Sequence, residues 1–164
     1  MSTAVVYGST TGATADAAGR IAEKLHADCL NVAEVSPEKL EKYDVLVLGS
    51  STWGAGDLQD DWEAFLPKFR ALNLKGKKAA VFGTGDHESF ADTFCMALVT
   101  LRDAAAECGA EIIGEGPVSG YDAISSDVCR GGKFAGLALD VQNQPELTDS
   151  RIDSWCADLL QKLS

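Results

Sequence analysis

Residues 3–14 have the sequence TAVVYGSTTGAT, which contains the clearest structural pattern of the chain. Its first part, Thr3–Tyr7, is a short apolar run rich in β-branched residues, which predicts a buried strand that ends at Gly8. A helical pattern begins at Ala13, because apolar residues then recur on one face: Ala18, Ile21, Ala22 and Leu25. We therefore expect a strand, a turn rich in hydroxyl groups and a helix, in that order.

Strand and helix patterns alternate along the rest of the chain. Strands are expected near residues 29–32, 45–49, 78–83, 112–113 and 134–139, and helical stripes at 62–69, from 94 to near 109, and from Thr148, a possible N-cap, to 163. This alternation predicts an α/β fold with a parallel sheet covered by helices on both faces. Residues 114–133 are rich in Gly, Ser and Asp and interrupt the last strand, so we expect a surface excursion within one domain spanning residues 1–164.

The composition narrows the class of partner. The 164 residues are 46% hydrophobic and 24% charged, with a net charge of −11. That charge disfavours nucleic acid and anionic membranes and favours a basic protein partner, unless the acidity serves solubility alone. No apolar run reaches membrane-spanning length and no secretory signal is evident, so the cytoplasm is the expected location. The five cysteines include no C-x-x-C pair, which argues against a zinc or thioredoxin-type site.

The turn at residues 8–14 has the features of a phosphate site. In open α/β sheets, ligands bind at the carboxyl ends of the strands. Hydroxyls and backbone N–H groups here converge on a helix N-terminus, which favours an anion. The turn has neither the Lys-[ST] of a triphosphate loop nor the G-x-G-x-x-G of a dinucleotide loop, so one compact monophosphate is expected. The alternative is that its Ser and Thr residues only cap the helix.

Two further loops follow predicted strands. In residues 50–56, Trp53 stands among small residues and is suited to stack on a flat ring, or else it packs the loop down. In residues 83–92, glycines permit close backbone approach, and Phe90 would form a second aromatic wall or belong to the core stripe of the next helix. His87 is expected to be a surface residue without a role.

These three loops, in this order and after these strands, resemble the flavodoxin family. The matching text is GSTTGAT at residues 8–14, STW at 51–53 and FGTGD at 82–86, and residues 53–62 and 132–155 are similar to that family as well. The excursion at about residues 115–133 resembles the insertion in the last strand of long-chain members. Three positions depart from the family pattern: Ala13 replaces a larger residue, Phe90 a tyrosine and His87 a glutamine.

The resemblance implies a three-layer sandwich with a five-stranded parallel sheet of order 2-1-3-4-5 and one FMN at its carboxyl edge. The phosphate would be held by Ser9, Thr10, Thr11, Gly12, Ala13 and Thr14. The inner side of the flavin ring would face Ser50, Ser51, Thr52, Trp53 and Gly54, with Trp53 stacked on it and Phe90 outside. Thr84, Gly85 and Asp86 would contact the pyrimidine edge, and Asp140 the ribityl chain.

The implied function is low-potential electron transfer, one electron at a time, between redox partner proteins. The flavin carries the chemistry, so no catalytic residues and no metal are needed. The Gly54 carbonyl is expected to accept a hydrogen bond from flavin N5 after one-electron reduction. The acids Asp57, Asp60, Asp61 and Glu63 would disfavour a second electron and dock a basic partner, or would simply favour a helix N-terminus. A monomer is expected.

Two other functions share this fold. An FMN-dependent quinone reductase would need a substrate pocket beside the ring, and the acidic strip after Trp53 argues against one. A receiver-type signalling module would need acidic residues at the strand ends, where this chain has Ser, Thr, Gly and Trp.

Overall fold

A computed structural model describes residues 2–10, 12–53, 56–90, 92–117, 121, 128–130 and 133–163 of the chain. Its central sheet contains five parallel strands in the order β10-β5-β3-β1-β2. Numbered along the chain, this is the order 2-1-3-4-5, so the expected topology is confirmed. The strands are β1 (Thr3–Gly8), β2 (Asp28–Asn31), β3 (Val45–Trp53), β5 (Lys78–Thr84) and β10 (Leu137–Leu139).

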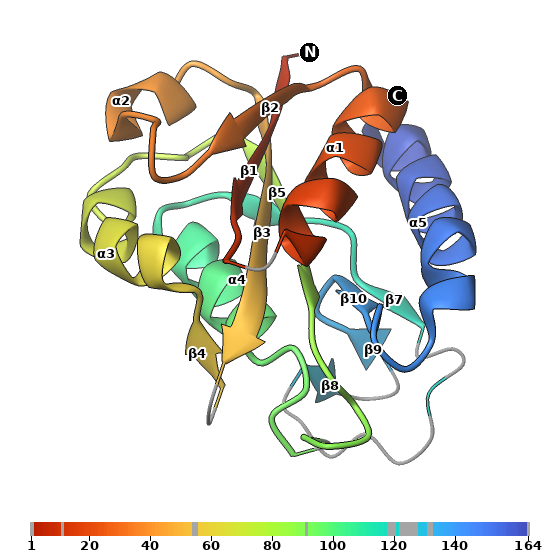
Figure 1. The fold of residues 1–164 in the computed structure, drawn as a ribbon. Coiled ribbons are helices and arrows are strands. Elements are labelled where there is room, and N and C mark those ends of the chain that lie inside the picture. The colour runs from red at the N-terminus through yellow and green to blue at the C-terminus, as the bar shows by residue number, and fades with distance from the viewer. Residues whose placement is uncertain are drawn as a thin grey trace.

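Helices cover both faces of this sheet, as the alternating pattern predicts (Figure 1). On one face lie α1 (Ala13–Leu25) and α5 (Thr148–Leu163), and on the other lie α3 (Asp60–Phe69) and α4 (Ala97–Glu107). A short helix, α2 (Pro37–Leu40), precedes β3. Within the described residues, none of these helices is long and apolar enough to cross a membrane.

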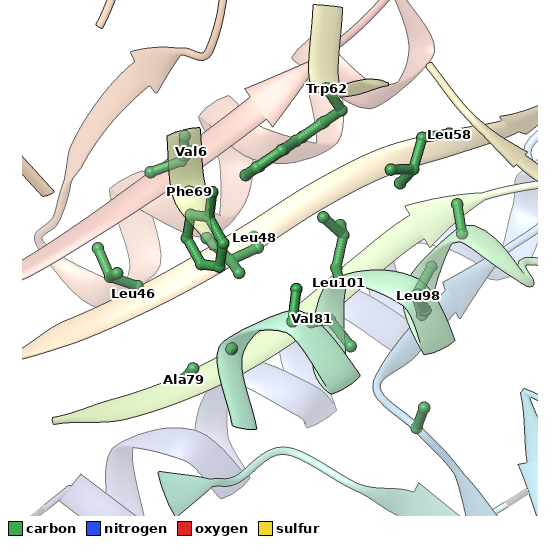
Figure 2. Packing of buried hydrophobic residues seen from close by; sticks show 14 of the residues in the cluster. Val6, Leu46, Leu48, Leu58, Trp62, Phe69, Ala79, Val81, Leu98 and Leu101 are labelled. Atoms are coloured by element: carbon green, nitrogen blue, oxygen red, sulfur yellow. The ribbon is translucent and has the colours of Figure 1, made fainter. Parts of the chain in front are cut away.

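Two hydrophobic clusters hold the layers together, one on each face of the sheet. Figure 2 shows the larger cluster, in which Trp62 and Phe69 of α3 and Leu101 of α4 point onto the middle strands. The Trp62 indole N–H donates to the carbonyl of Gly49 at 2.6 Å, so this buried ring also anchors α3 to β3. The apolar runs therefore fix the strands that position the loops at the sheet edge.

The fifth strand position is split by the excursion. β6 (Glu111–Ile112) pairs with the start of β5, whereas β10 pairs with its end. Between them, three short antiparallel strands form a separate sheet in the order β7-β9-β8. These strands are β7 (Gly116–Pro117), β8 (Cys129–Arg130) and β9 (Lys133–Phe134).

Two local expectations are wrong. The strand expected to end at Gly49 continues to Trp53, because its last residues pair with β4 (Asp57–Leu58) in an antiparallel hairpin. Thr148 does not cap α5 from outside, because it already has helical dihedral angles (φ −59°, ψ −51°) and follows a 3-10 turn, η1 (Pro145–Leu147).

Candidate functional site

The three loops that follow β1, β3 and β5 begin side by side at one edge of the sheet. Gly8 is in register with Ser50, and Ser50 with Gly83. In the sheet, β2 lies on one side of β1 and β3 lies on its other side, so the direction in which strands are added reverses at β1. This reversal point is where open α/β sheets bind their ligands. We name the loops by residues: the first loop (8–14), the second loop (50–56) and the third loop (83–92).

The first loop leads into α1 without a side-chain cap. Gly12 occupies the N-cap position with φ +94° and, as a glycine, offers no capping side chain, so the part of the chain that the structure describes shows no side-chain cap at this helix start. The Ser9 hydroxyl instead accepts from the Gly12 amide at 3.1 Å. The amides at the start of α1 are therefore open to an anion, which favours the phosphate interpretation over the capping one. Thr11, which we expected in this site, lies outside the described residues.

One predicted residue of the first loop faces inward. Thr14 is buried, and its hydroxyl lies 3.1 Å from that of Thr84 at the end of β5. This contact ties the start of α1 to the third loop. The geometry favours a supporting role for both side chains, in which the backbone carries any ligand contact.

The second loop is braced by its own hydroxyl groups. The buried Ser50 hydroxyl donates to the carbonyl of Ser51 at 2.8 Å and accepts from the amide of Gln59 at 3.1 Å. The Thr52 hydroxyl accepts from the amide of Ala97 at 3.1 Å, which fixes the start of α4. The backbone of Trp53 ends β3, whereas its side chain and the whole of Gly54 lie outside the described part of the chain.

The third loop approaches the site with its backbone. The amide of Gly85 donates to the carbonyl of Leu139 at 2.9 Å, and a Cβ at Gly85 would lie 3.0 Å from the Phe94 ring. The carboxylate of Asp86 accepts from the amides of Glu88 and Ser89, and the latter bond holds the pKa of Asp86 below its ordinary value. Phe90 is 57% exposed, so it does not belong to the core. It is available as an aromatic wall.

Asp140 is fully buried and forms the centre of a polar cluster behind the third loop. Its two oxygens accept from the amides of His87, Gln142 and Asn143, from the Asn143 side chain at 2.8 Å and from His87 Nδ1 at 2.5 Å. Burial alone would raise the pKa of Asp140, but the hydrogen bonds from Asn143 and His87 outweigh it and lower that pKa. Asn143 also donates to Asp86 at 2.7 Å, so the cluster reaches the loop itself.

His87 is therefore not the surface residue that the sequence led us to expect. Its side chain is 10% exposed, and its ring packs edge-on against Tyr121 and Phe94, with centroids 5.0 and 5.9 Å away. An ionised carboxylate can only accept a hydrogen bond, so His87 Nδ1 carries a hydrogen and is the donor to Asp140. The guanidinium carbon of Arg151 lies above the Tyr121 ring, 4.0 Å from its centroid.

Acidic side chains surround the start of α3, close to the second loop. Asp60, Asp61 and Glu63 lie in the first turn of α3, and Asp57 lies on β4. Within the described residues, none of the four forms an ion pair with Lys or Arg. Their charge is favourable at a helix N-terminus and at the same time leaves a negative surface beside the site.

These features fit a flavin nucleotide that carries a single phosphate. The uncapped amides and hydroxyls of the first loop suit the phosphate, and the exposed ring of Phe90 with the close backbone at Gly85 suits a flat aromatic group. The sequence indicates no supporting role for Gln59 or His87, because that role depends on hydrogen bonds to Thr10 and Asp140, which lie far away in the sequence.

Comparison with known proteins identifies the family of this chain. The family model described as Flavodoxin matches residues 5–155. Flavodoxin 1 of Escherichia coli K12 is 40% identical over 165 residues, which cover 98% of this chain and 94% of that protein. The flavodoxin of Haemophilus influenzae is 37% identical over 161 residues, covering 96% and 92%. The crystal structure of Fusobacterium nucleatum flavodoxin bound to flavin mononucleotide has a TM-score of 0.91 and 27% identity, and covers 98% of both chains. The chain belongs to the flavodoxin family.

Proposed function

We propose that this chain carries electrons one at a time between redox partner proteins by means of one non-covalently bound FMN. The observation that carries the proposal is the first loop, where uncapped amides at the start of α1 follow the end of β1. Gly8, the last residue of β1, is in register with Ser50 of β3, and Ser50 is in register with Gly83 of β5. FMN, when bound, supplies the redox chemistry. The protein supplies binding, orientation and the electrostatic environment.

The roles of the binding residues follow from their exposure. Ser9, Thr10 and the amides that follow Gly12 hold the phosphate, and the backbone of Gly85 and Asp86 holds the pyrimidine edge. Thr14, Ser50, Thr84 and Asp140 are buried and hydrogen-bonded to other protein groups, so we assign them to bracing the loops. Trp53 and Phe90 are proposed as the two aromatic walls, and the Gly54 carbonyl as the acceptor for flavin N5.

The first experiment is stepwise photoreduction of the FMN-loaded protein, followed by visible spectroscopy. We expect a yellow protein that passes through a half-reduced form with long-wavelength absorption before it bleaches. A direct change to the two-electron reduced form, with NAD(P)H–quinone turnover in the absence of a partner, would indicate an FMN-dependent quinone reductase. Failure to retain FMN would reject the proposal.

The acidic surface beside the second loop is proposed to lower the potential for the second electron. Asp60 and Asp61 oppose the negative charge that accumulates on the cofactor. Asp60→Asn/Asp61→Asn should therefore raise that midpoint potential in a spectroelectrochemical titration. The matched control is Glu38→Gln/Glu111→Gln, which removes two charges from the opposite end of the sheet, where α2 lies and β6 pairs with the start of β5 (Figure 1). Equal shifts in both variants would reject a local effect.

The same acids are proposed to dock partner proteins with basic faces. Electrostatic docking of this kind weakens as salt screens the charges. Turnover with a basic redox partner should fall as ionic strength rises, and it should fall less in Asp60→Asn/Asp61→Asn than in the control variant. A monomer in the cytoplasm remains our prediction for the state in which this docking takes place.

A further inference from the structure

Gln59 links the first loop to the second loop and to α3. It is 2% exposed and occupies the N-cap of α3. Its backbone amide donates to Ser50, its side-chain oxygen accepts from the amide of Asp61 at 3.0 Å, and its side-chain nitrogen donates to Thr10 Oγ1 at 3.1 Å and to Asp61 Oδ2 at 3.0 Å. All the polar groups of this buried side chain are therefore engaged.

The orientation of this amide is determined by the helix. A backbone N–H can only donate, so the group that faces the amide of Asp61 must be the oxygen of Gln59. The nitrogen then has to face Thr10, and the reverse orientation would leave two donors opposed. The capping of α3 thus decides which end of Gln59 meets the first loop.

This orientation determines what the Thr10 hydroxyl can do. A hydroxyl has one hydrogen to donate, and here its oxygen already accepts from Gln59 Nε2. Among the described residues, Thr10 has no second hydrogen-bond partner, and its side chain is exposed in the first loop. Its hydrogen is therefore available for an acceptor from outside, such as a phosphate oxygen. Hydrogen bonds in such a chain polarise and strengthen one another.

Gly8 provides the space that this arrangement needs. A Cβ at Gly8 would stand 2.3 Å from Gln59 Oε1 and 2.8 Å from Cδ1 of the Trp62 ring. Any larger residue at the end of β1 would displace the Gln59 amide from between α3 and the first loop. The position of Gln59 is thus built into the sheet as well as into the helix.

We propose that Gln59 is a positioning residue that sets the Thr10 hydroxyl as a donor to the phosphate ester, and so favours FMN over riboflavin. This inference rests on the proposed role of the first loop in holding the phosphate. A residue that merely capped α3 would affect both flavins alike, because both place the same ring in the same site.

The test is the dissociation constant of FMN and of riboflavin for the apoprotein and for Gln59→Ser. Serine is a good N-cap and neutral, but it is too short to reach Thr10, so the cap of α3 is retained while the donor is lost. We expect the FMN dissociation constant to rise about tenfold or more, the usual effect of losing one hydrogen bond linked to a charged group. Riboflavin affinity should stay within about twofold. An equal loss for both flavins would overturn the inference.

A double-mutant cycle with Thr10→Val shows whether Gln59 acts through this hydroxyl. If it does, Gln59→Ser should have little further effect on FMN binding once Thr10 is valine, and additive losses would overturn the inference. If Thr10→Val alone leaves the ratio of FMN to riboflavin affinity unchanged, the Thr10 hydroxyl does not bind the phosphate and the inference is overturned, whereas failure of the parent protein to retain FMN rejects the proposed function itself. If Gln59→Ser does not fold, Gln59→Glu takes its place, because glutamate keeps the oxygen that caps α3 and lacks the nitrogen that donates to Thr10. The same double-mutant cycle with Thr10→Val then tests the inference.

Discussion

The first loop and the third loop of the site differ in how far the protein itself satisfies their polar groups. The first loop has uncapped amides at the start of α1 and an exposed Thr10. The third loop rests on a buried cluster in which Asp140 alone accepts five hydrogen bonds. The third-loop side of the site is therefore formed in advance, whereas the first-loop side, in the proposed function, depends on the anion to complete it.

Among the substitutions that test this difference, Asp140→Ala should have the largest effect on the free energy of unfolding. Its removal leaves three part-buried backbone amides and two side-chain donors without their acceptor, which should lower the free energy of unfolding by about 3 kcal/mol. Urea denaturation of the apoprotein measures this loss. A change below about 1 kcal/mol would mean that the cluster does not stabilise the third loop.

His87→Ala should have the next largest effect. It removes the donor to Asp140 and the edge-on contacts with Tyr121 and Phe94, and we expect a loss of about 1–2 kcal/mol. His87→Gln should recover part of this loss, because its amide can donate to the same carboxylate. Urea denaturation of both variants tests this. Identical stability of His87→Ala and the parent protein would contradict it.

Acid should weaken the same cluster. The pKa values of Asp86 and Asp140 are lower in the folded protein than their ordinary value of about 3.9, so their stabilisation is complete above that pH and is lost as pH falls through the folded values. At pH values below about 4, the melting temperature should therefore decrease as the pH is lowered. Asp140→Asn should show a flatter profile over this range, and parallel profiles would remove Asp140 from the explanation.

The smallest effect is expected for Ser9→Ala in the first loop. Its hydroxyl accepts one hydrogen bond, from the Gly12 amide of an exposed turn, so the apoprotein should lose no more than about 0.5 kcal/mol. The same variant should bind FMN more weakly, by isothermal titration calorimetry, because the turn then costs more to order. A large loss of apoprotein stability would show that the first loop is as firmly organised as the third.

The sequence predicts the parts of this protein that rest on local patterns. The apolar runs at Thr3–Tyr7 and Val45–Gly49 and the stripe of α3 are enough for the parallel sheet and its covering helices. The loops meet because parallel strands end at one edge, so the site could be placed before the side chains were known. The structure of the second loop was harder to predict from the sequence, because β3 continues to Trp53 only where β4 pairs with it.

The supporting residues could not be predicted in this way. His87 and Asp140 are 53 positions apart in the sequence, and Gln59 and Thr10 are 49 apart. A buried histidine or glutamine has no periodic signature, and its role depends on which donor faces which acceptor in the folded chain. Such pairs become visible only when the segments that carry them are placed side by side.

The interruption of the fifth strand affects whether two copies of this protein can associate through the edges of their sheets. An outermost strand with a long row of unpaired backbone groups invites pairing with a second molecule and thereby aggregation. Here that border is divided into two residues of β6 and three of β10, with the small antiparallel sheet between them in the chain. Within the residues that the structure describes, a neighbour would find no continuous template along this border, which disfavours edge-to-edge association.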